Sequence, residues 1–279
     1  MKKINTIKKL PLRLFIWIYF VISVYPFLYL IFYSLKDNNE IFFTNSFGFP
    51  KVLRFENYIK GIKAFNMTLY FRNSVIVTAI SIVFVVLFSL AFAYAVARIN
   101  WKFAKAAYAY ILFGIFIPLP VMMIPLAILG RELKISGTYM SVILPYIAFN
   151  LAFSSLIFYG FFRTIPAEME ESAYIDGAGL FRTFIQIMVP LVKPAIATVT
   201  TFAFINIWNE YAMALVLLNN IRLRTLPVGL ATSFIGAFQT EWGPMGAAMV
   251  IASLPMIIIY LFLSEQVERA MTIGSAVKG

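Results

Sequence analysis

The sequence predicts an all-α integral membrane protein with six transmembrane helices. Of its 279 residues, 62% are hydrophobic and only 13% are charged, whereas a soluble domain is about half apolar and about a quarter charged. The apolar residues form long continuous runs, and a run of about 18 can cross a hydrocarbon core roughly 30 Å thick. The runs lack the apolar–polar alternation of transmembrane β-strands, so helices are expected.

Six apolar runs are expected to span the membrane. The basic segment 1–13 precedes the first run, which is too long for a signal-peptide core and does not end in an Ala-x-Ala-like cleavage site. The fifth run is longer than a membrane requires, and we expect it to begin in the interface. The predicted spans are, approximately, residues 14–35, 73–97, 106–129, 139–162, 184–218 and 246–264.

The distribution of lysine and arginine predicts that both termini are cytoplasmic. Five basic residues lie within segment 1–13, and Arg98, Lys102 and Lys105 follow the second span. Cytoplasmic loops carry such an excess, although the bias over all loops is small because the external loop 36–71 is also basic. Loop 163–183 and the tail 265–279 are then cytoplasmic.

The composition excludes several kinds of chemistry. The chain has no cysteine and no histidine, which excludes disulfides, thiolate nucleophiles, Cys or His metal sites and imidazole acid–base catalysis. We expect no bound metal. The net charge of +11 is more simply explained by basic flanks that face anionic lipid than by nucleic acid. The sequence contains no G-x-x-x-x-G-K-[ST] phosphate loop.

An acidic segment lies between the fourth and fifth apolar runs. Glu168, Glu170 and Glu171 follow Pro166, which suits the first turn of a helix, and the helix dipole favours negative charge there. Asp176 is the fourth acid, and Gly177 and Gly179 offer a stop in the left-handed conformation. A second helix is expected from near Leu180. This pattern predicts a short helix, a tight turn and a re-entry helix.

The short helix has two interpretations on physical grounds alone. Met169, Ala173 and Gly177 recur at every fourth position, which predicts a small apolar face that could enter a groove of another protein. The alternative is a solvated loop whose acids favour a helix start. Catalysis by these acids is not expected, because we predict them to be exposed and no histidine is available.

The segment "ESAYIDGA" followed by "IMVP" resembles the EAA signature of ABC importer permeases. The matching positions are Glu171, Ala173, Gly177, Ile187 and Pro190. Ser172 and Val189 replace the usual Ala and Leu conservatively. Further segments resemble the maltose-type carbohydrate permeases in order: 55–78, "AYAVAR" at 93–98, "IP" at 117–118 and 124–125, "WNE" at 208–210 and "LPVGL" at 226–230. The resemblance therefore covers nearly the whole chain.

The resemblance implies the MetI-like fold of type I ABC importer permeases in a bacterial or archaeal cytoplasmic membrane. It implies that a coupling helix docks on a cytoplasmic ATPase subunit and that this chain itself binds no cofactor, ATP and Mg being held by partner subunits. The implied partners are a second homologous permease in a heterodimer, two ATPase subunits, an external solute-binding protein, a carbohydrate and membrane lipid. Nucleic acid is not an expected partner. The implied coupling residues are Glu171, Ser172, Ala173, Asp176, Gly177, Ala178 and Pro190.

Two further regions carry expectations from the resemblance. The external loop 36–71 could cap the pathway, touch the binding protein or serve only as a connector. The tail "GSAVKG" is one residue longer than the family's usual Gly-Ala-Val-Lys-Gly ending. A contact of the tail with another subunit is expected, and the extra residue leaves open which tail residues make it. The residues concerned are Val277, Lys278 and Gly279.

The segment "FINIWNEY" places polar side chains inside the fifth run. Ionisable groups at membrane depth are costly and usually face a bundle interior or a cavity. The candidate pathway residues are Asn206, Trp208, Asn209, Glu210 and Tyr211. Asn and Glu could bind sugar hydroxyls and Trp208 could stack on a sugar ring. Alternatively, the polar side chains form interhelical hydrogen bonds at the interface with the partner permease.

Three rival functions remain open. An ABC permease could carry a polyol or a glycerol phosphate instead of an oligosaccharide. An ion-coupled secondary transporter would depend on Glu210 as its proton carrier and lacks a clear inverted repeat. A membrane-embedded enzyme is disfavoured because no catalytic constellation is present.

Overall fold

The computed structural model describes residues 10–64, 66–234 and 241–276. Within these ranges all regular secondary structure is helical. The chain divides into two compact units. The first unit contains residues 1–67 and 230–254, and the second contains residues 68–229 and 255–279. Each unit is described by itself below.

The helices follow one another with short connections. In chain order they are α2 (Leu10–Ser34), η1 (Glu40–Thr44), α3 (Glu56–Ala64), α4 (Met67–Arg98), α5 (Ala104–Phe113), η2 (Gly114–Phe116), α6 (Leu119–Glu132), α7 (Met140–Thr164), α8 (Glu168–Ile175), α9 (Leu180–Thr183), η3 (Phe184–Met188), α10 (Val189–Leu191), α11 (Lys193–Trp208), α12 (Ala212–Leu217), η4 (Ile221–Leu223), α13 (Leu226–Phe234) and α14 (Trp242–Ala276).

Four helices in the described ranges are long and apolar enough to cross a membrane. They are Pro11–Ser34, Met67–Arg98, Met140–Thr164 and Trp242–Ser264. They correspond to the predicted first, second, fourth and sixth spans. The predicted third and fifth spans are instead bent pairs, and counting each pair as one span raises the number to six.

The predicted third span over 106–129 is sharply bent, because the chain turns by 103° between Ala104–Phe116 and Leu119–Glu132. Ile117 has φ −81° and ψ 113°, and Pro118 has ψ 127°. A proline disfavours the α conformation of the preceding residue and donates no backbone hydrogen bond. The Ile117–Pro118 pair therefore ends one helix and starts another.

The predicted fifth span also breaks. Leu180–Leu191 and Lys193–Trp208 meet at 74°, and Val192 between them has φ −95° and ψ 15°. Pro194 follows within the first turn of α11, where its missing N–H costs nothing. The early part of the run, α9 to α10, is thus separate from α11, and the run ends at α12. At the other end of the chain, α14 continues to Ala276, beyond the predicted sixth span.

The loop that follows α2 in the first unit is ordered by buried polar groups. Lys36 is 0% exposed, and its Nζ donates to the carbonyls of Asn45 (2.6 Å) and Ser46 (3.2 Å). Burial lowers the pKa of this amine. Glu40, also buried, accepts from the Asn45 side chain (2.9 Å) and from the Lys51 amide (2.7 Å). These buried hydrogen bonds hold the loop in one ordered conformation.

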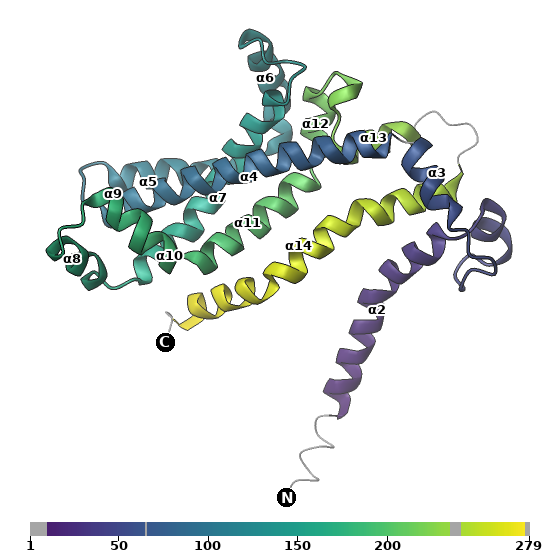
Figure 1. Ribbon diagram of the computed structural model, residues 1–279, viewed down its shortest axis with the longest axis horizontal. Coiled ribbons are helices and arrows are strands. Elements are labelled where there is room, and N and C mark those ends of the chain that lie inside the picture. Colours follow the sequence, from purple (N-terminus) through teal and green to yellow (C-terminus); the bar gives the residue numbers. More distant parts are fainter. Residues whose placement is uncertain (1–9, 65, 235–240, 277–279) are drawn as a thin grey trace, which may run out of the picture. The chain divides into compact units, whose positions relative to one another are not determined.

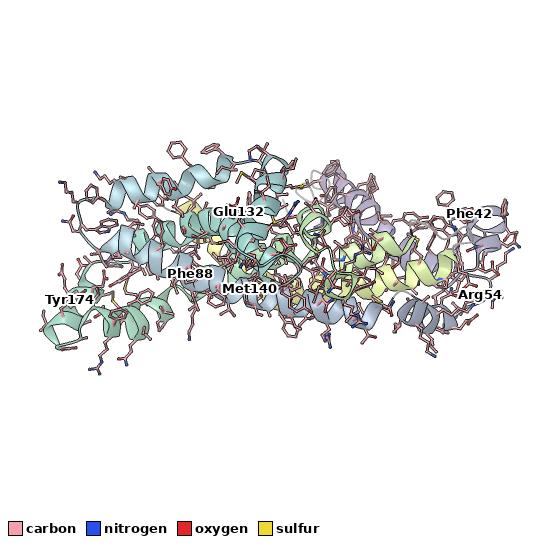
Figure 2. All side chains as sticks on the ribbon, turned by 90° about the horizontal axis from the view of Figure 1, so that it is seen from above. Phe42, Arg54, Phe88, Glu132, Met140 and Tyr174 are labelled. Atoms are coloured by element: carbon pink, nitrogen blue, oxygen red, sulfur yellow. The ribbon has the colours of Figure 1, made fainter. Side chains whose placement is uncertain are left out.

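The second unit has one apolar core to which α4, α7, α11 and α12 contribute. Its fully buried members include Val85, Phe158, Val199 and Met213. In Figure 1, α8 and α9 lie at one end of this unit, away from α6 and α12. Figure 2 shows the same separation, with Tyr174 of α8 far from Glu132 and Met140. The acidic segment and the polar segment after α11 are therefore distinct sites.

Candidate functional site

Helix α8 forms as the sequence predicts and ends in a tight glycine turn. Gly177 has φ +80°, the left-handed conformation that glycine adopts without a Cβ penalty. The amide of Ala178 donates to the carbonyl of Ala173 (2.9 Å), and the amide of Gly177 donates to that of Tyr174 (3.0 Å). These two bonds are those of a Schellman motif. The turn then leads through Gly179 into α9.

The exposed side chains of α8 are both apolar and acidic. Tyr174 is 48% exposed and Ile175 is 86% exposed. Met169 is also exposed, whereas Ala173 is buried. The predicted small face of Met169, Ala173 and Gly177 is therefore wrong for Ala173, because that side chain packs against the permease itself. The predicted coupling residues Glu171, Ser172, Asp176 and Gly177 are exposed, and Ala178 is partly buried.

Pro190 is separated from α8 along the chain. It lies in α10, directly after the π-helix η3 and two residues before the bend at Val192. Its neighbour Ile187, which also matches the EAA spacing, lies in η3. The two ends of the motif therefore occupy different elements: the Glu–Gly part forms the short helix and its cap, and the Ile–Pro part forms the helix that re-enters.

Glu170 departs from the expectation that all the acids are exposed. Its side chain is 11% exposed and forms an ion pair with Arg98, whose side chain is 12% exposed. The Arg98 Nε donates to Glu170 Oε2 (2.5 Å), and the Tyr94 hydroxyl donates to Oε1 (2.8 Å). Burial of a paired charge requires such compensation. The predicted coupling residues do not include Glu170, and the sequence indicates Arg98 only as a topology signal and as the end of the "AYAVAR" segment.

A cavity of about 480 Å³ lies beside this ion pair. The end of α4 and the following residues Ile99 and Asn100 form one wall, and α8 with Leu180 forms the other. Glu171 and Tyr174 also contribute to its lining. The cavity therefore joins the exposed acids of α8 to the buried pair.

Glu210, in the polar segment after α11, is a helix cap. Its two carboxylate oxygens accept from the amides of Met213 (2.7 Å) and Ala214 (2.9 Å), the first turn of α12. The Tyr146 hydroxyl of α7 donates to the same carboxylate (2.6 Å). A carboxylate at a helix N-terminus satisfies amides that have no partner within the helix. The observed bonds are thus internal to the chain.

Trp208 is 4% exposed and packs between two aromatic rings. It stacks on Phe204 with ring centroids 5.4 Å apart and meets Phe71 edge-on at 5.5 Å. In this conformation its ring belongs to the core of the second unit, so it does not offer a surface to a sugar.

Asn206 and Asn209 are the exposed members of the segment. Asn206 donates to the side chain of Asn150 on α7 (3.3 Å), and Asn209 donates to the carbonyl of Ile205 (2.9 Å). Tyr211 is half-buried against the core. Of the five predicted pathway residues, the two asparagines are therefore those that present polar groups outward. The predicted tail contact at Val277, Lys278 and Gly279 lies outside the described residues.

Comparison with known proteins identifies the family. The model of the "binding-protein-dependent transport system inner membrane component" family matches residues 86–273. A putative ABC transporter permease protein of Caldicellulosiruptor sp. (strain Rt8B.4) is 34% identical over 95% of this chain and 96% of that protein. The diacetylchitobiose uptake system permease protein NgcG of Streptomyces coelicolor is 30% identical over 91% of this chain and 84% of that protein.

A solved structure has the same fold. The crystal structure of a bacterial ABC transporter involved in the import of the acidic polysaccharide alginate contains a chain with a TM-score of 0.82 and 23% identity, covering 94% of this chain and 96% of that chain. The present chain belongs to the binding-protein-dependent transport system inner membrane component family. It is a membrane permease component of an ABC importer, and the resemblance to that class is confirmed.

Proposed function

We propose that this chain is the permease subunit through which an ABC importer moves an oligosaccharide into the cytoplasm. Family membership establishes the class, and the named cargo of the Streptomyces relative is a disaccharide of amino sugars. The chain would work with a second homologous permease, two ATPase subunits and an external solute-binding protein. ATP and Mg would be bound by the ATPase subunits and no cofactor by this chain.

Helix α8 carries the proposal that this chain couples to the ATPase. The helix is short, ends in the glycine turn at Gly177, and exposes Tyr174 and Ile175 while burying Ala173. Exposed aromatic and aliphatic side chains at the centre of a polar rim are typical of a protein interface. Glu171, Ser172, Asp176, Gly177 and Ala178 would form the rim and turn of that contact.

The proposed topology has six spans with both termini in the cytoplasm. It counts α5–α6 and α9–α11 each as one broken span. Helix breaks at membrane depth are tolerated where the freed backbone groups are buried in protein or line a water-filled cavity. The two bends would therefore border the transport pathway rather than face lipid.

The pathway in this subunit would be bordered by Asn206 and Asn209. Both are exposed, Asn206 in the last turn of α11 and Asn209 directly after it, and an exposed amide is costly in lipid but suited to sugar hydroxyls or to a partner helix. Glu210 and Tyr211 would support them by fixing the start of α12, and Trp208 would hold α11 against α4. The second permease would then supply the remaining sugar contacts.

Reconstitution of the complete transporter in proteoliposomes tests this function. The binding protein and labelled oligosaccharides of two to four sugars are placed outside, with a labelled polyol and glycerol phosphate as competing cargoes, and ATP is enclosed. We expect oligosaccharide uptake that requires ATP and is unaffected by ionophores. Uptake that follows an ion gradient, or that occurs only with the polyol or the phosphate, would contradict the proposal.

A further inference from the structure

The guanidinium of Arg98 joins three helices. Arg98 is the last residue of α4, and its Nε and Nη2 both approach the Glu170 carboxylate of α8. Its Nη1 donates to the carbonyls of Ile165 (2.9 Å) and Phe162 (3.4 Å), which belong to the C-terminal end of α7. The planar fork of arginine can serve a carboxylate on one edge and carbonyls on another.

Tyr94 completes this group from one turn earlier on α4. Its hydroxyl donates to the second Glu170 oxygen (2.8 Å), and its ring packs on Phe162 with centroids 5.5 Å apart. Both oxygens of Glu170 are thus held by α4, and the ring that holds one of them is fixed by α7. We call Tyr94, Arg98 and Glu170 the Arg98 clasp.

Only two short segments of backbone connect α8 to its neighbouring helices. Residues 165–167 link it to α7, and the turn from Asp176 to Gly179 links it to α9. No segment connects α8 directly to α4, which is about 70 residues earlier in the sequence. A force applied to α8 reaches α4 directly through side-chain contacts, and the Arg98 clasp supplies the charged, hydrogen-bonded one.

We propose that the Arg98 clasp consists of positioning residues that make α8 move as one body with the cytoplasmic ends of α4 and α7. This inference rests on the proposed function, in which ATPase movement is applied to α8. The clasp delivers that movement to two spans at once. Without the Arg98 clasp, α8 moves relative to α4 and α7 about the two short segments that connect it to α7 and α9, and the two spans stay in place.

The adjoining cavity makes the clasp testable without unfolding the protein. Because the cavity of about 480 Å³ reaches Arg98 and Glu170, water can enter when one partner is changed. An unpaired charge would then be hydrated instead of remaining buried in a dry core. Glu170→Gln keeps the shape of the side chain and an acceptor for Tyr94. It replaces the oxygen that faces Arg98 by an NH2 group, so that the charge and the acceptor that Arg98 requires are both removed.

The experiment measures the distance between α8 and the end of α4. The chain has no cysteine, so spin labels can be attached at Asn100→Cys and Glu168→Cys, both at exposed positions. Pulsed electron paramagnetic resonance is recorded on the assembled transporter in nanodiscs, before and after trapping with ADP and vanadate. Arg163→Gln, an exposed arginine in the last turn of α7, is the matched control variant.

The parent and Arg163→Gln should give one narrow distance distribution that trapping does not move. Glu170→Gln should broaden the distribution and make it shift on trapping, because α8 follows the ATPase while α4 stays. Arg98→Lys, which keeps the charge but loses the fork, should have the same effect. A distribution in Glu170→Gln that is identical to the parent, with ATPase bound, would overturn the clasp. If the parent binds no ATPase subunit, the proposed function itself fails.

Discussion

Replacement of Gly177 separates the stability of α8 from its docking. Gly177 has φ +80°, and a Cβ built at this position meets no atom within 4 Å. The chain by itself therefore has room for a side chain, and the cost is conformational only. An L-residue in the left-handed region costs about 1–2 kcal/mol, and asparagine or aspartate less. A side chain at position 177 therefore meets no steric obstacle within this chain.

Two variants at Gly177 differ in the backbone strain and in the size of the side chain that they introduce. Gly177→Ala should cost about 1–2 kcal/mol locally and adds one methyl group. Gly177→Asn should cost less in backbone strain and adds a larger polar side chain. If the ATPase subunit packs closely against the turn, asparagine should impair transport more than alanine, although it perturbs the permease less. Gly177→Asp adds a charge to the same shape and should impair transport at least as much.

The assay compares three measurements on each Gly177 variant: thermal unfolding of the purified permease, retention of the ATPase subunits, and ATP-dependent uptake in proteoliposomes. We expect near-parental unfolding for all three variants and reduced uptake for asparagine and aspartate. Full uptake by Gly177→Asn and Gly177→Asp with ATPase bound would refute the coupling role of this turn. Greater impairment by alanine would show that backbone geometry matters more than the docked contact.

The remaining predictions concern stability. Gly229→Ala places a Cβ 2.1 Å from the buried Tyr70 ring. It should lower the free energy of unfolding by about 1–3 kcal/mol through overpacking. The control is Gly160→Ala on α7, where a Cβ meets nothing within 4 Å, and this variant should raise the free energy of unfolding by up to about 1 kcal/mol. Equal unfolding midpoints for the two would contradict the packing argument. Glu210→Ala should lower the free energy of unfolding by about 1–2 kcal/mol, because it removes the cap of α12. Tyr146→Phe should cost about 1 kcal/mol by removing one hydrogen bond. Unchanged unfolding with an altered cargo range would instead make Glu210 a pathway residue.

Local features of the coupling segment were predictable because they depend on neighbouring residues. Proline before the helix, acids in its first turn and glycine at its end each act within a few residues, and α8 and its cap form where these signals lie. The breaks at Pro118 and near Pro194 have the same local cause, although their angles of 103° and 74° could not be derived from the proline positions. The packing of neighbouring helices sets such angles.

The sequence by itself determined the class of protein, the apolar runs, the short helix with its glycine turn, and the EAA spacing, because hydrophobic length and local backbone preferences require no distant partner. Only the tertiary structure decided which acid is buried. Glu168, Glu170 and Glu171 are chemically alike and adjacent, and Arg98 is far away in the sequence. The way α4 and α7 pack brings Arg98 and Tyr94 to Glu170 alone. The tertiary structure likewise decided that Tyr146 of α7 binds the Glu210 carboxylate and that Trp208 is a core residue, because both outcomes depend on side chains from other helices.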